Sequence, residues 1–296
     1  MLAGNGIFGG VTSPVRAALA GVSLGDGLPV AVVGALNVGP GSFYGGSVVT
    51  RSDELLCAAE RMVQEGAALL DVGARSTAPY LADTISTSEE AERLGWAIAL
   101  LAGKLGVAVS ADTSRVEPAR AALDAGASII NDVRGLTGDP ALAPLVAERG
   151  VGLIAMASEP AAMTAGPPVE TVLEILRRAL DIADRAGIAP ERVVVDPGIG
   201  FFRRRDIAWH RWDCAVLAGL ERFRALGRPI CVGASRKSFI GEIADEPDPV
   251  RRLPGSLAAA TAAVLAGAHM IRAHDVADTV QAVRVAEAVR GARERA

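Results

Sequence analysis

The sequence has few cysteines and no long uninterrupted apolar run. Its three cysteines, Cys57, Cys214 and Cys231, show no CxxC pair and no metal-ligand spacing. An odd number of unpaired cysteines is typical of reduced thiols, so we expect a cytoplasmic protein. No stretch approaches the roughly 18 apolar residues that a membrane helix needs. The N-terminus lacks the basic and apolar regions of a signal peptide, and we expect no membrane association.

An excess of charge of one sign is also missing, and aromatic residues are scarce. The net charge is −4 with the two signs interspersed. Without a basic stripe, a nucleic-acid partner is not expected. Apolar residues make up 50% of the chain but aromatic residues only 4%. The core must therefore consist of alanine, valine, leucine and isoleucine, which suits helices packed closely over parallel strands.

From residue 29 onward, the chain repeats a strand followed by a helix. Residues 1–28 are rich in glycine, with a weak helical patch over 13–20, and we expect them to form an N-terminal extension to a single domain over 29–296. Short apolar runs predict strands at 29–36, 67–70, 107–111, 128–130, 151–155, 193–195, 229–232 and 268–271. Helical periodicity, with glycine at several ends, predicts helices at 53–66, 88–105, 116–125, 139–149, 169–186, 212–226, 256–266 and 275–290.

Eight such units predict an α/β protein, a closed (β/α)₈ or TIM barrel, since this fold usually needs ~250 residues. A doubly wound open sheet is the alternative. In a barrel, the carboxyl ends of the strands form one face, and the active site lies there. Polar residues stand at six of the predicted strand ends, namely Asn37, Asp71, Asp112, Asn131, Asp196 and Arg272.

The stretch 193–201, VVVDPGIGF, illustrates this arrangement best. Three valines run directly into Asp196, and Pro197 with two glycines then ends the strand. A carboxylate at the end of a buried strand is costly unless something pairs with it. Such an aspartate can simply cap the following turn. Its recurrence at other strand ends favours a shared binding site.

Six motifs of the chain follow the order and spacing of a known family. They read NVGPGSF (37–43), DVGARST (71–77), DTSRVEPARAALDAGASIINDVRGL (112–136), DPGIGF (196–201), GASRKSFIG (233–241) and RAHDV (272–276). Over roughly residues 30–290 the chain resembles the pterin-binding family, and within it the synthases that join a dihydropterin methyl pyrophosphate to p-aminobenzoate and release pyrophosphate. The resemblance implies small-molecule substrates, Mg²⁺ and a homodimer.

The resemblance implies a pterin pocket made of Asp112, Asn131, Met156, Asp196 and Lys237. A pterin presents a ring N–H beside an exocyclic amine, and a carboxylate can accept both hydrogen bonds. An asparagine offers both a donor and an acceptor, which suits mixed ring positions. Taken singly, these residues could also be caps or turn residues.

The resemblance further implies a pyrophosphate site of Asn37, Arg272 and His274, with Asn37 contacting the Mg²⁺. Alternation along a strand places Arg272 and His274 on the same side. A lone strand-end histidine is more often structural, and Lys237 could simply begin a solvated helix.

Catalytic roles are implied for Lys237, Arg272, His274 and Asp112, because the reaction needs no protein nucleophile but must stabilise departing negative charge. The residues implied at the amine and its loops are Ser76, Thr77, Phe201 and Ser235.

Three loops depart from the family's pattern. Gly39 and Gly41 replace threonine and aspartate, Arg75 and Ala78 replace glutamate and arginine, and Phe202 replaces a glycine. Three interpretations follow: an ordinary synthase, a paralogue that uses another arylamine as in a methanopterin-type pathway, or a pterin-binding protein or methyl-pterin methyltransferase module without synthase activity. The retained cations argue against the third interpretation. Turnover that depends on an arylamine would separate it from the other two.

The predicted helix 256–266, SLAAATAAVLA, is small and apolar on all sides. A helix of this kind is buried. On the outer ring of a barrel this favours a contact between two subunits, although close packing against neighbouring helices explains it equally well.

Overall fold

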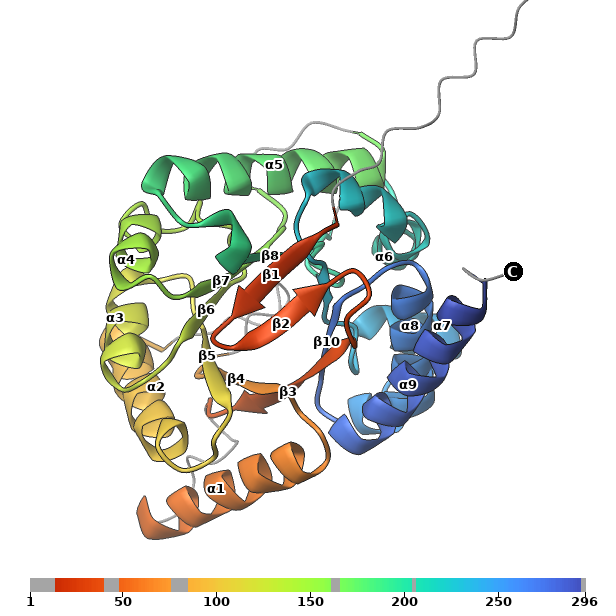
Figure 1. The fold of residues 1–296 in the computed structure, drawn as a ribbon. Helices are drawn as coiled ribbons and strands as arrows, with labels where there is room; N and C mark the ends of the chain where they lie inside the picture. Colours follow the sequence, from red (N-terminus) through yellow and green to blue (C-terminus); the bar gives the residue numbers. More distant parts are fainter. Residues whose placement is uncertain (1–13, 40–47, 76–84, 161–165, 204–205, 294–296) are drawn as a thin grey trace, which may run out of the picture.

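The protein folds into a barrel of parallel strands surrounded by helices (Figure 1). The computed structural model describes residues 14–39, 48–75, 85–160, 166–203 and 206–293, without the side chains of 48–51. The barrel strands follow one another in the order β8-β7-β6-β5-β4-β3-β10-β9. They are β3 (Ala31–Asn37), β4 (Leu69–Gly73), β5 (Ala108–Asp112), β6 (Ile129–Asp132), β7 (Gly152–Met156), β8 (Val193–Asp196), β9 (Cys231–Val232) and β10 (Met270–Ala273).

The sheet closes between its two edge strands. Val195 on β8 forms a parallel bridge with Ile230, just before β9. The amide of Val195 also donates to the carbonyl of Pro229 at 3.0 Å. These contacts confirm the predicted (β/α)₈ barrel and exclude the open doubly wound sheet.

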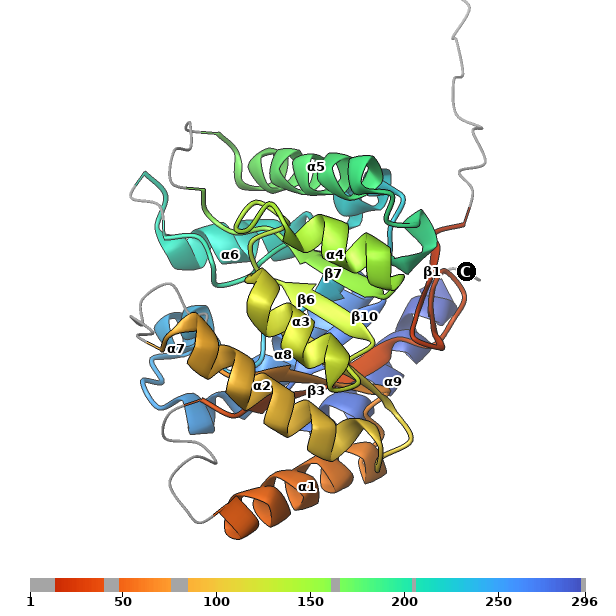
Figure 2. The ribbon, with the colours of Figure 1, turned by 90° about the vertical axis from the view of Figure 1, so that its left-hand side faces the viewer.

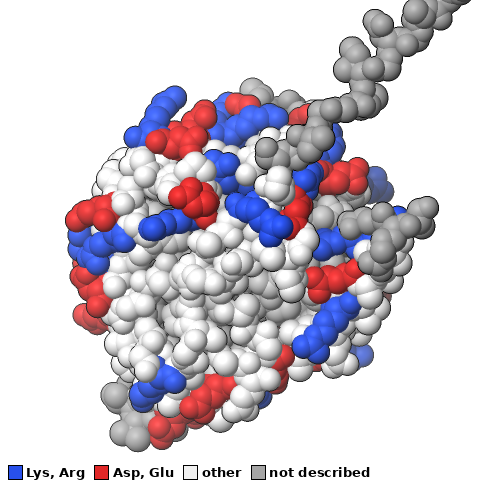
Figure 3. Space-filling view, in the orientation of Figure 1, with Lys and Arg blue, Asp and Glu red and all other residues white. Residues whose placement is uncertain are grey.

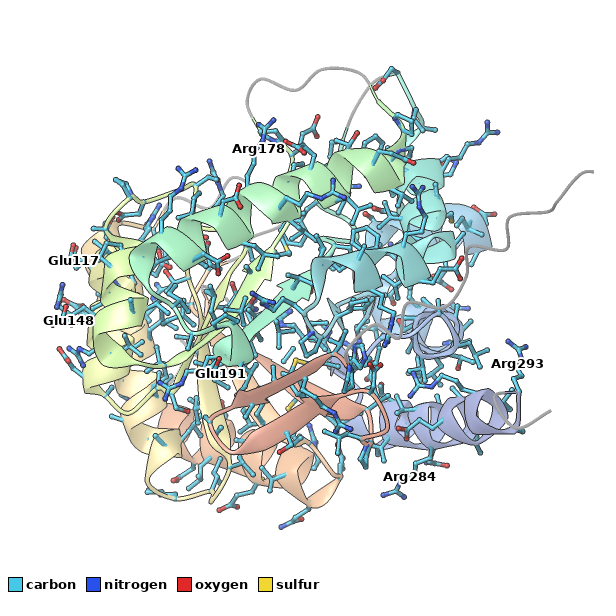
Figure 4. All side chains as sticks on the ribbon, turned by 45° about the horizontal axis from the view of Figure 1, so that its top comes forward. Glu117, Glu148, Arg178, Glu191, Arg284 and Arg293 are labelled. Carbon is cyan, nitrogen blue, oxygen red and sulfur yellow. The ribbon has the colours of Figure 1, made fainter. Side chains whose placement is uncertain are left out.

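Helices cover the outside of the barrel, and their charged side chains, such as Glu117, Arg178 and Arg284, point outward (Figure 4). The α-helices are α1 (Val48–Gln64), α2 (Thr87–Ala102), α3 (Val116–Asp124), α4 (Leu142–Arg149), α5 (Pro168–Ala186), α6 (Trp209–Ala218), α7 (Ser238–Ala244), α8 (Leu253–Leu265) and α9 (Val276–Arg293). Short 3₁₀ helices are η2 (Pro190–Arg192), η3 (Leu220–Leu226) and η4 (Pro249–Arg252). The helix predicted over 212–226 is therefore two helices, α6 and η3, separated by Gly219.

The helical patch predicted over 13–20 is wrong, because these residues begin an antiparallel hairpin of β1 (Arg16–Leu19) and β2 (Val22–Gly25). Burial alternates along β1, with Ala17 and Leu19 buried and the residues before each exposed. The two-residue turn uses Ala20 and Gly21, both with positive φ, which matches the twist of a tight hairpin.

This hairpin lies across one end of the barrel (Figures 1 and 2). Leu19 and Leu24 are fully buried in a cluster with Val33, Ile154 and Met270 from the barrel interior. The hairpin therefore fills the amino-terminal end of the barrel and leaves the carboxyl ends of the strands open at the other. The division of the chain at residue 28 stays a prediction.

The face seen in Figure 3 carries both signs of charge around a broad area without charged side chains. Within the described part of the chain, no helix has the length and apolar character needed to cross a membrane. All three cysteines are free, with Cys231 buried and Cys57 and Cys214 exposed.

Candidate active site

A cavity at the carboxyl ends of the strands brings the predicted pterin-pocket residues together. Its walls come from β5, β6, β7, β8 and β10 and from the segments that follow β8 and β9. The side chains and backbone that line it belong to Asp112, Asn131, Val133, Met156, Asp196, Ile199, Phe201, Gly233, Lys237 and Arg272. Every residue predicted to contact the pterin therefore lies around one hollow.

Arg272 is held at the centre of this mouth by two acids. Its Nε donates to Asp71 Oδ2 at 2.6 Å, and its Nη2 donates to Asp112 Oδ2 at 3.1 Å. Asp71 is fully buried and also accepts a hydrogen bond from Asn131 Nδ2 at 2.9 Å. Asp71 therefore orients both the Arg272 guanidinium and the Asn131 amide. Its position at a strand end did not by itself reveal this role.

The two acids that face the cavity are both easier to protonate than ordinary aspartates. Burial and the neighbouring Asp71 raise the pKa of Asp112 to about 7, although Arg272 opposes this shift. Burial raises the pKa of Asp196 to about 6, while its Oδ1 accepts the Gly198 N–H at 2.7 Å. Asp112 Oδ1 is buried and has no hydrogen-bond partner among the described residues. N–H donors of a ligand would therefore stabilise these carboxylates in their charged form.

Lys237 is the residue directly before α7, and its side chain extends into the cavity. Its side chain lies against Gly200, since a Cβ on that glycine would stand 3.0 Å from Lys237 Cδ. Its ammonium lies 4.2 Å from the centre of the Phe201 ring, a favourable cation–π distance. Burial, and then Arg272, lower the pKa of Lys237 to about 8. The lysine is therefore mainly protonated at neutral pH and close to the point of losing its proton.

His274, two residues beyond Arg272, pairs with Ser235. The Oγ of Ser235 lies 3.0 Å from His274 Nδ1 and 3.3 Å from the His274 backbone nitrogen. Although His274 is exposed, partial loss of hydration, followed by the charges of Arg272 and Arg236, lowers its pKa, so its ring is neutral at pH 7. Ser235, predicted near the amine, therefore stands beside the histidine predicted for the pyrophosphate. Arg236 is turned away into an ion pair with Asp275.

Asn37 ends β3 and folds back onto its own loop. Its Oδ1 accepts the N–H of Gly39 at 2.8 Å. A Cβ at Gly39 would lie 2.9 Å from that oxygen and 3.2 Å from the carbonyl of Ala74. A side chain at position 39 would therefore require Asn37 to shift.

The other described departures from the family pattern also have structural partners. Arg75 Nε lies 3.4 Å from Oε2 of Glu90, a fully buried residue of α2. Phe202 is buried and stacks on Trp212, with 5.1 Å between ring centres. Four of the residues discussed from the sequence, Gly41, Ser76, Thr77 and Ala78, lie outside the described residues.

Sequence reasoning missed two buried acids near the site. Glu90 accepts from Thr113 and Arg115 and faces Arg75, but in the sequence it is one of two glutamates that begin a helix. Asp213 on α6 is fully buried and accepts the Gly200 N–H at 2.8 Å. The one available signal for Asp213 was an acid within the otherwise apolar face of a helix.

The closed barrel and its mouth of paired acids, an amide and two cations define a (β/α)₈-barrel enzyme with a pocket suited to a flat heterocycle. Residues 33–274 match the family model described as "Pterin binding enzyme". The chain is 38% identical to the dihydropteroate synthase of Escherichia coli, over 89% of this chain and 93% of that protein. It is 40% identical to the dihydropteroate synthase of Mycobacterium leprae, over 87% and 92% of the two chains.

Solved structures give the same answer. A dihydropteroate synthase from Xanthomonas albilineans, crystallised with 4-aminobenzoic acid, matches with a TM-score of 0.83 and 35% identity, covering 94% of this chain and 98% of that one. The complex of the same enzyme with 7,8-dihydropteroate matches with a TM-score of 0.81 over 93% and 98% of the two chains. This chain therefore belongs to the pterin-binding enzymes, and within them to the dihydropteroate synthases, a family of transferases.

Proposed function

We propose that this protein condenses 6-hydroxymethyl-dihydropterin pyrophosphate with p-aminobenzoate and releases pyrophosphate, a step of folate biosynthesis. The observation that carries the proposal is the convergence of Asp112, Asn131, Asp196, Lys237 and Arg272 on one cavity. These side chains supply the acceptors, the amide and the cations that a pterin pyrophosphate requires.

The pterin ring would lie between the acids and the lysine. Asp196 and Asp112 offer carboxylate oxygens to the ring N–H and the exocyclic amine, and Asn131, fixed by Asp71, offers its amide oxygen. Lys237 would donate to the ring carbonyl and N5 side, with Met156 packed below the ring. Because the carboxylates are buried, these hydrogen bonds are stronger than the same bonds in water.

In the reaction, the amine nitrogen uses its lone pair to form a bond to the methylene carbon. The bond between that carbon and the pyrophosphate oxygen breaks, and its electron pair leaves with pyrophosphate. The excess proton of the new secondary amine passes to water. Asp112 and Asp196 stabilise positive charge that develops on the pterin, and Arg272 and His274 hydrogen-bond the departing oxygens. No side-chain nucleophile is required.

Mg²⁺ is part of the proposal, with Asn37 as its protein ligand. Within the described residues, no group of three histidine, cysteine or acidic side chains could hold a metal ion. This fits Mg²⁺, which keeps several waters and is often bound through substrate phosphates with few protein ligands. Asn37 Oδ1 accepts one hydrogen bond from Gly39 and retains a second lone pair. When bound, the ion would neutralise charge on the leaving pyrophosphate.

The second substrate is proposed to be p-aminobenzoate and not a larger arylamine. Glycines at positions 39 and 41 suggest room for a larger amine. Around Gly39, the Asn37 oxygen and the Ala74 carbonyl lie close, and Gly41 lies outside the described residues. Phe201 and Ser235, with Ser76 and Thr77, are the proposed surroundings of the amine. Other arylamines are therefore alternative outcomes of the test.

A cytoplasmic homodimer is the proposed form of the enzyme. The outward face of α8 exposes Ala258 and Ala262, and α9 exposes Val285 and Val289. Light scattering after size-exclusion chromatography should give twice the chain mass, and Ala262→Arg should reduce it to a monomer. A wild-type monomer would contradict the dimer.

The function is tested by measuring pyrophosphate release from the pterin substrate with Mg²⁺, with and without p-aminobenzoate. We expect release that depends on the amine and falls by at least about 100-fold in Lys237→Ala and Asp196→Asn, as for other lost charge contacts in a transition state. Tight binding of the pterin without release with any arylamine would overturn the proposal and favour a methyl-pterin protein.

A further inference from the structure

Asp213 is a buried acid with one oxygen unused. It lies on α6, outside the ring of strand ends, and is fully buried. Its Oδ1 accepts the Gly200 N–H at 2.8 Å, and its Oδ2 has no hydrogen-bond partner in the described part of the chain. Binding one backbone N–H does not require a charged group, since the amide oxygen of an asparagine would do the same. The buried charge itself therefore needs an explanation.

The position of Gly200 links this acid to Lys237. The N–H of Gly200 donates to Asp213. The α-carbon of Gly200 faces the Lys237 side chain, since a Cβ on this glycine would stand 3.0 Å from Lys237 Cδ. The next residue, Phe201, lies under the lysine ammonium at 4.2 Å. Fixing Gly200 therefore fixes both the groove for the lysine stem and the ring below its charge.

We propose that Asp213 is a positioning residue of the active site, which holds Gly200 and Phe201 beneath Lys237 and places a negative charge behind the lysine that substrate does not reach. Its value to catalysis rests on the proposed function of Lys237 in binding the pterin.

The other charges around Lys237 explain why a dedicated acid is needed. Arg272 on β10 lowers the pKa of the lysine, and the acids Asp196 on β8 and Asp112 on β5 raise it together with Asp213. The neutral His274 ring also lies nearby, and Arg203 faces Asp213. Asp112 and Asp196 line the cavity and would be occupied by substrate N–H groups. Asp213 does not line the cavity, so its charge stays with the lysine when substrate is bound.

The charge state of Lys237 can be measured directly, because the chain contains two lysines, Lys104 and Lys237. Reductive methylation with ¹³C-formaldehyde keeps the charge of each amine and gives each lysine an NMR signal that can be titrated. Lys104 is exposed and serves as an internal reference. We expect Asp213→Asn to lower the pKa of Lys237 by about one pH unit and to leave Lys104 unchanged, as loss of a nearby opposite charge predicts.

Two further variants keep the result interpretable. Asp213→Ser removes the same charge with a smaller side chain, so it tests the charge if the asparagine variant folds poorly. Asp184→Asn removes the same charge from an exposed position near the end of α5 and should leave both lysines unchanged. A Lys237 pKa that stays the same in both Asp213 variants would overturn the proposal.

A kinetic measurement connects this result to turnover. In Asp213→Asn, the alkaline limb of the pH profile of kcat/KM should move to lower pH by the same amount. At pH values above the alkaline limbs of both proteins, kcat/KM of the variant should be about tenfold lower than that of the wild type. A uniform loss at all pH values would show that Asp213 has a structural role alone and would overturn the proposal. If the wild type does not turn over, the proposed function fails, but the titration still decides the role of Asp213.

Discussion

Asp196→Asn should make the protein more stable at pH 8 while destroying its activity. Asp196 is 6% exposed, and burial raises its pKa from the ordinary 3.8 to about 6. The folded state therefore binds the proton more tightly than the unfolded state. The stability this gives is fully present below pH 3.8 and is lost as pH rises through 6. The total is about 3 kcal/mol, of which about 1.4 kcal/mol is lost between pH 5 and 8.

The asparagine keeps an oxygen for the Gly198 N–H but cannot ionise, so it lacks this part of the pH dependence. Urea unfolding at pH 5 and 8 should show the difference in unfolding free energy between variant and wild type shifting by about 1.4 kcal/mol in favour of the variant. Asp181→Asn, which alters an exposed carboxylate on α5, should show no such shift. A variant whose stability follows the wild type at both pH values would refute the reasoning.

Three further predictions concern the mouth and the hairpin. A plot of kcat/KM against pH should be bell-shaped. The value of kcat/KM should fall as pH drops through about 7 to 6, where Asp112 and Asp196 take up protons. It should also fall as pH rises through about 8, where Lys237 loses its proton. A flat profile over pH 6 to 9 would contradict this assignment. Asn37→Ala should weaken Mg²⁺–pyrophosphate binding several-fold in product-inhibition assays, whereas unchanged inhibition would exclude Asn37 from that site. Leu19→Ala should lower the unfolding free energy by about 3 kcal/mol in urea, and a loss below about 1 kcal/mol would show that the hairpin is not part of the folding core.

The barrel could be predicted because its strands are buried along almost their whole length, and all but β7 end at, or directly before, a polar or glycine residue. These signals are local and repeat eight times, so an error at one strand does not alter the fold. The hairpin was missed because β1 and β2 are four residues each and the turn contains an alanine with positive φ. The packing of Leu19 and Leu24 against the barrel interior stabilises these strands, and no local pattern encodes that contact.

The candidate site was predictable where a residue ends a strand and less so elsewhere. Asp112, Asn131, Asp196 and Arg272 converge because parallel strands bring their carboxyl ends to one face. Asp213 could not be assigned, since its partner Gly200 is 13 residues away on a loop whose path depends on the whole barrel.

The structural role of the departures from the family pattern at Arg75 and Phe202 could not be predicted either, because it depends on contacts between residues that are distant in the sequence. Each is explained by a partner, Glu90 or Trp212, that the sequence does not place next to it.

The charges of the mouth also suggest how substrate binding is coupled to protons. The pKa values of Asp112 and Asp196, about 7 and about 6, are raised because burial disfavours their charge, and at Asp112 the neighbouring Asp71 adds to this effect, even beside Arg272. A pterin that donates N–H groups to them stabilises the ionised forms and must therefore release protons on binding. In the proposed reaction, the released protons would leave negative charge beside the pterin, whereas the pyrophosphate would lie next to Arg272 and His274. Since Arg272 is bonded to Asp112 and Asp71, it would link the acids proposed to bind the ring to the proposed site of the leaving group, within a single cavity.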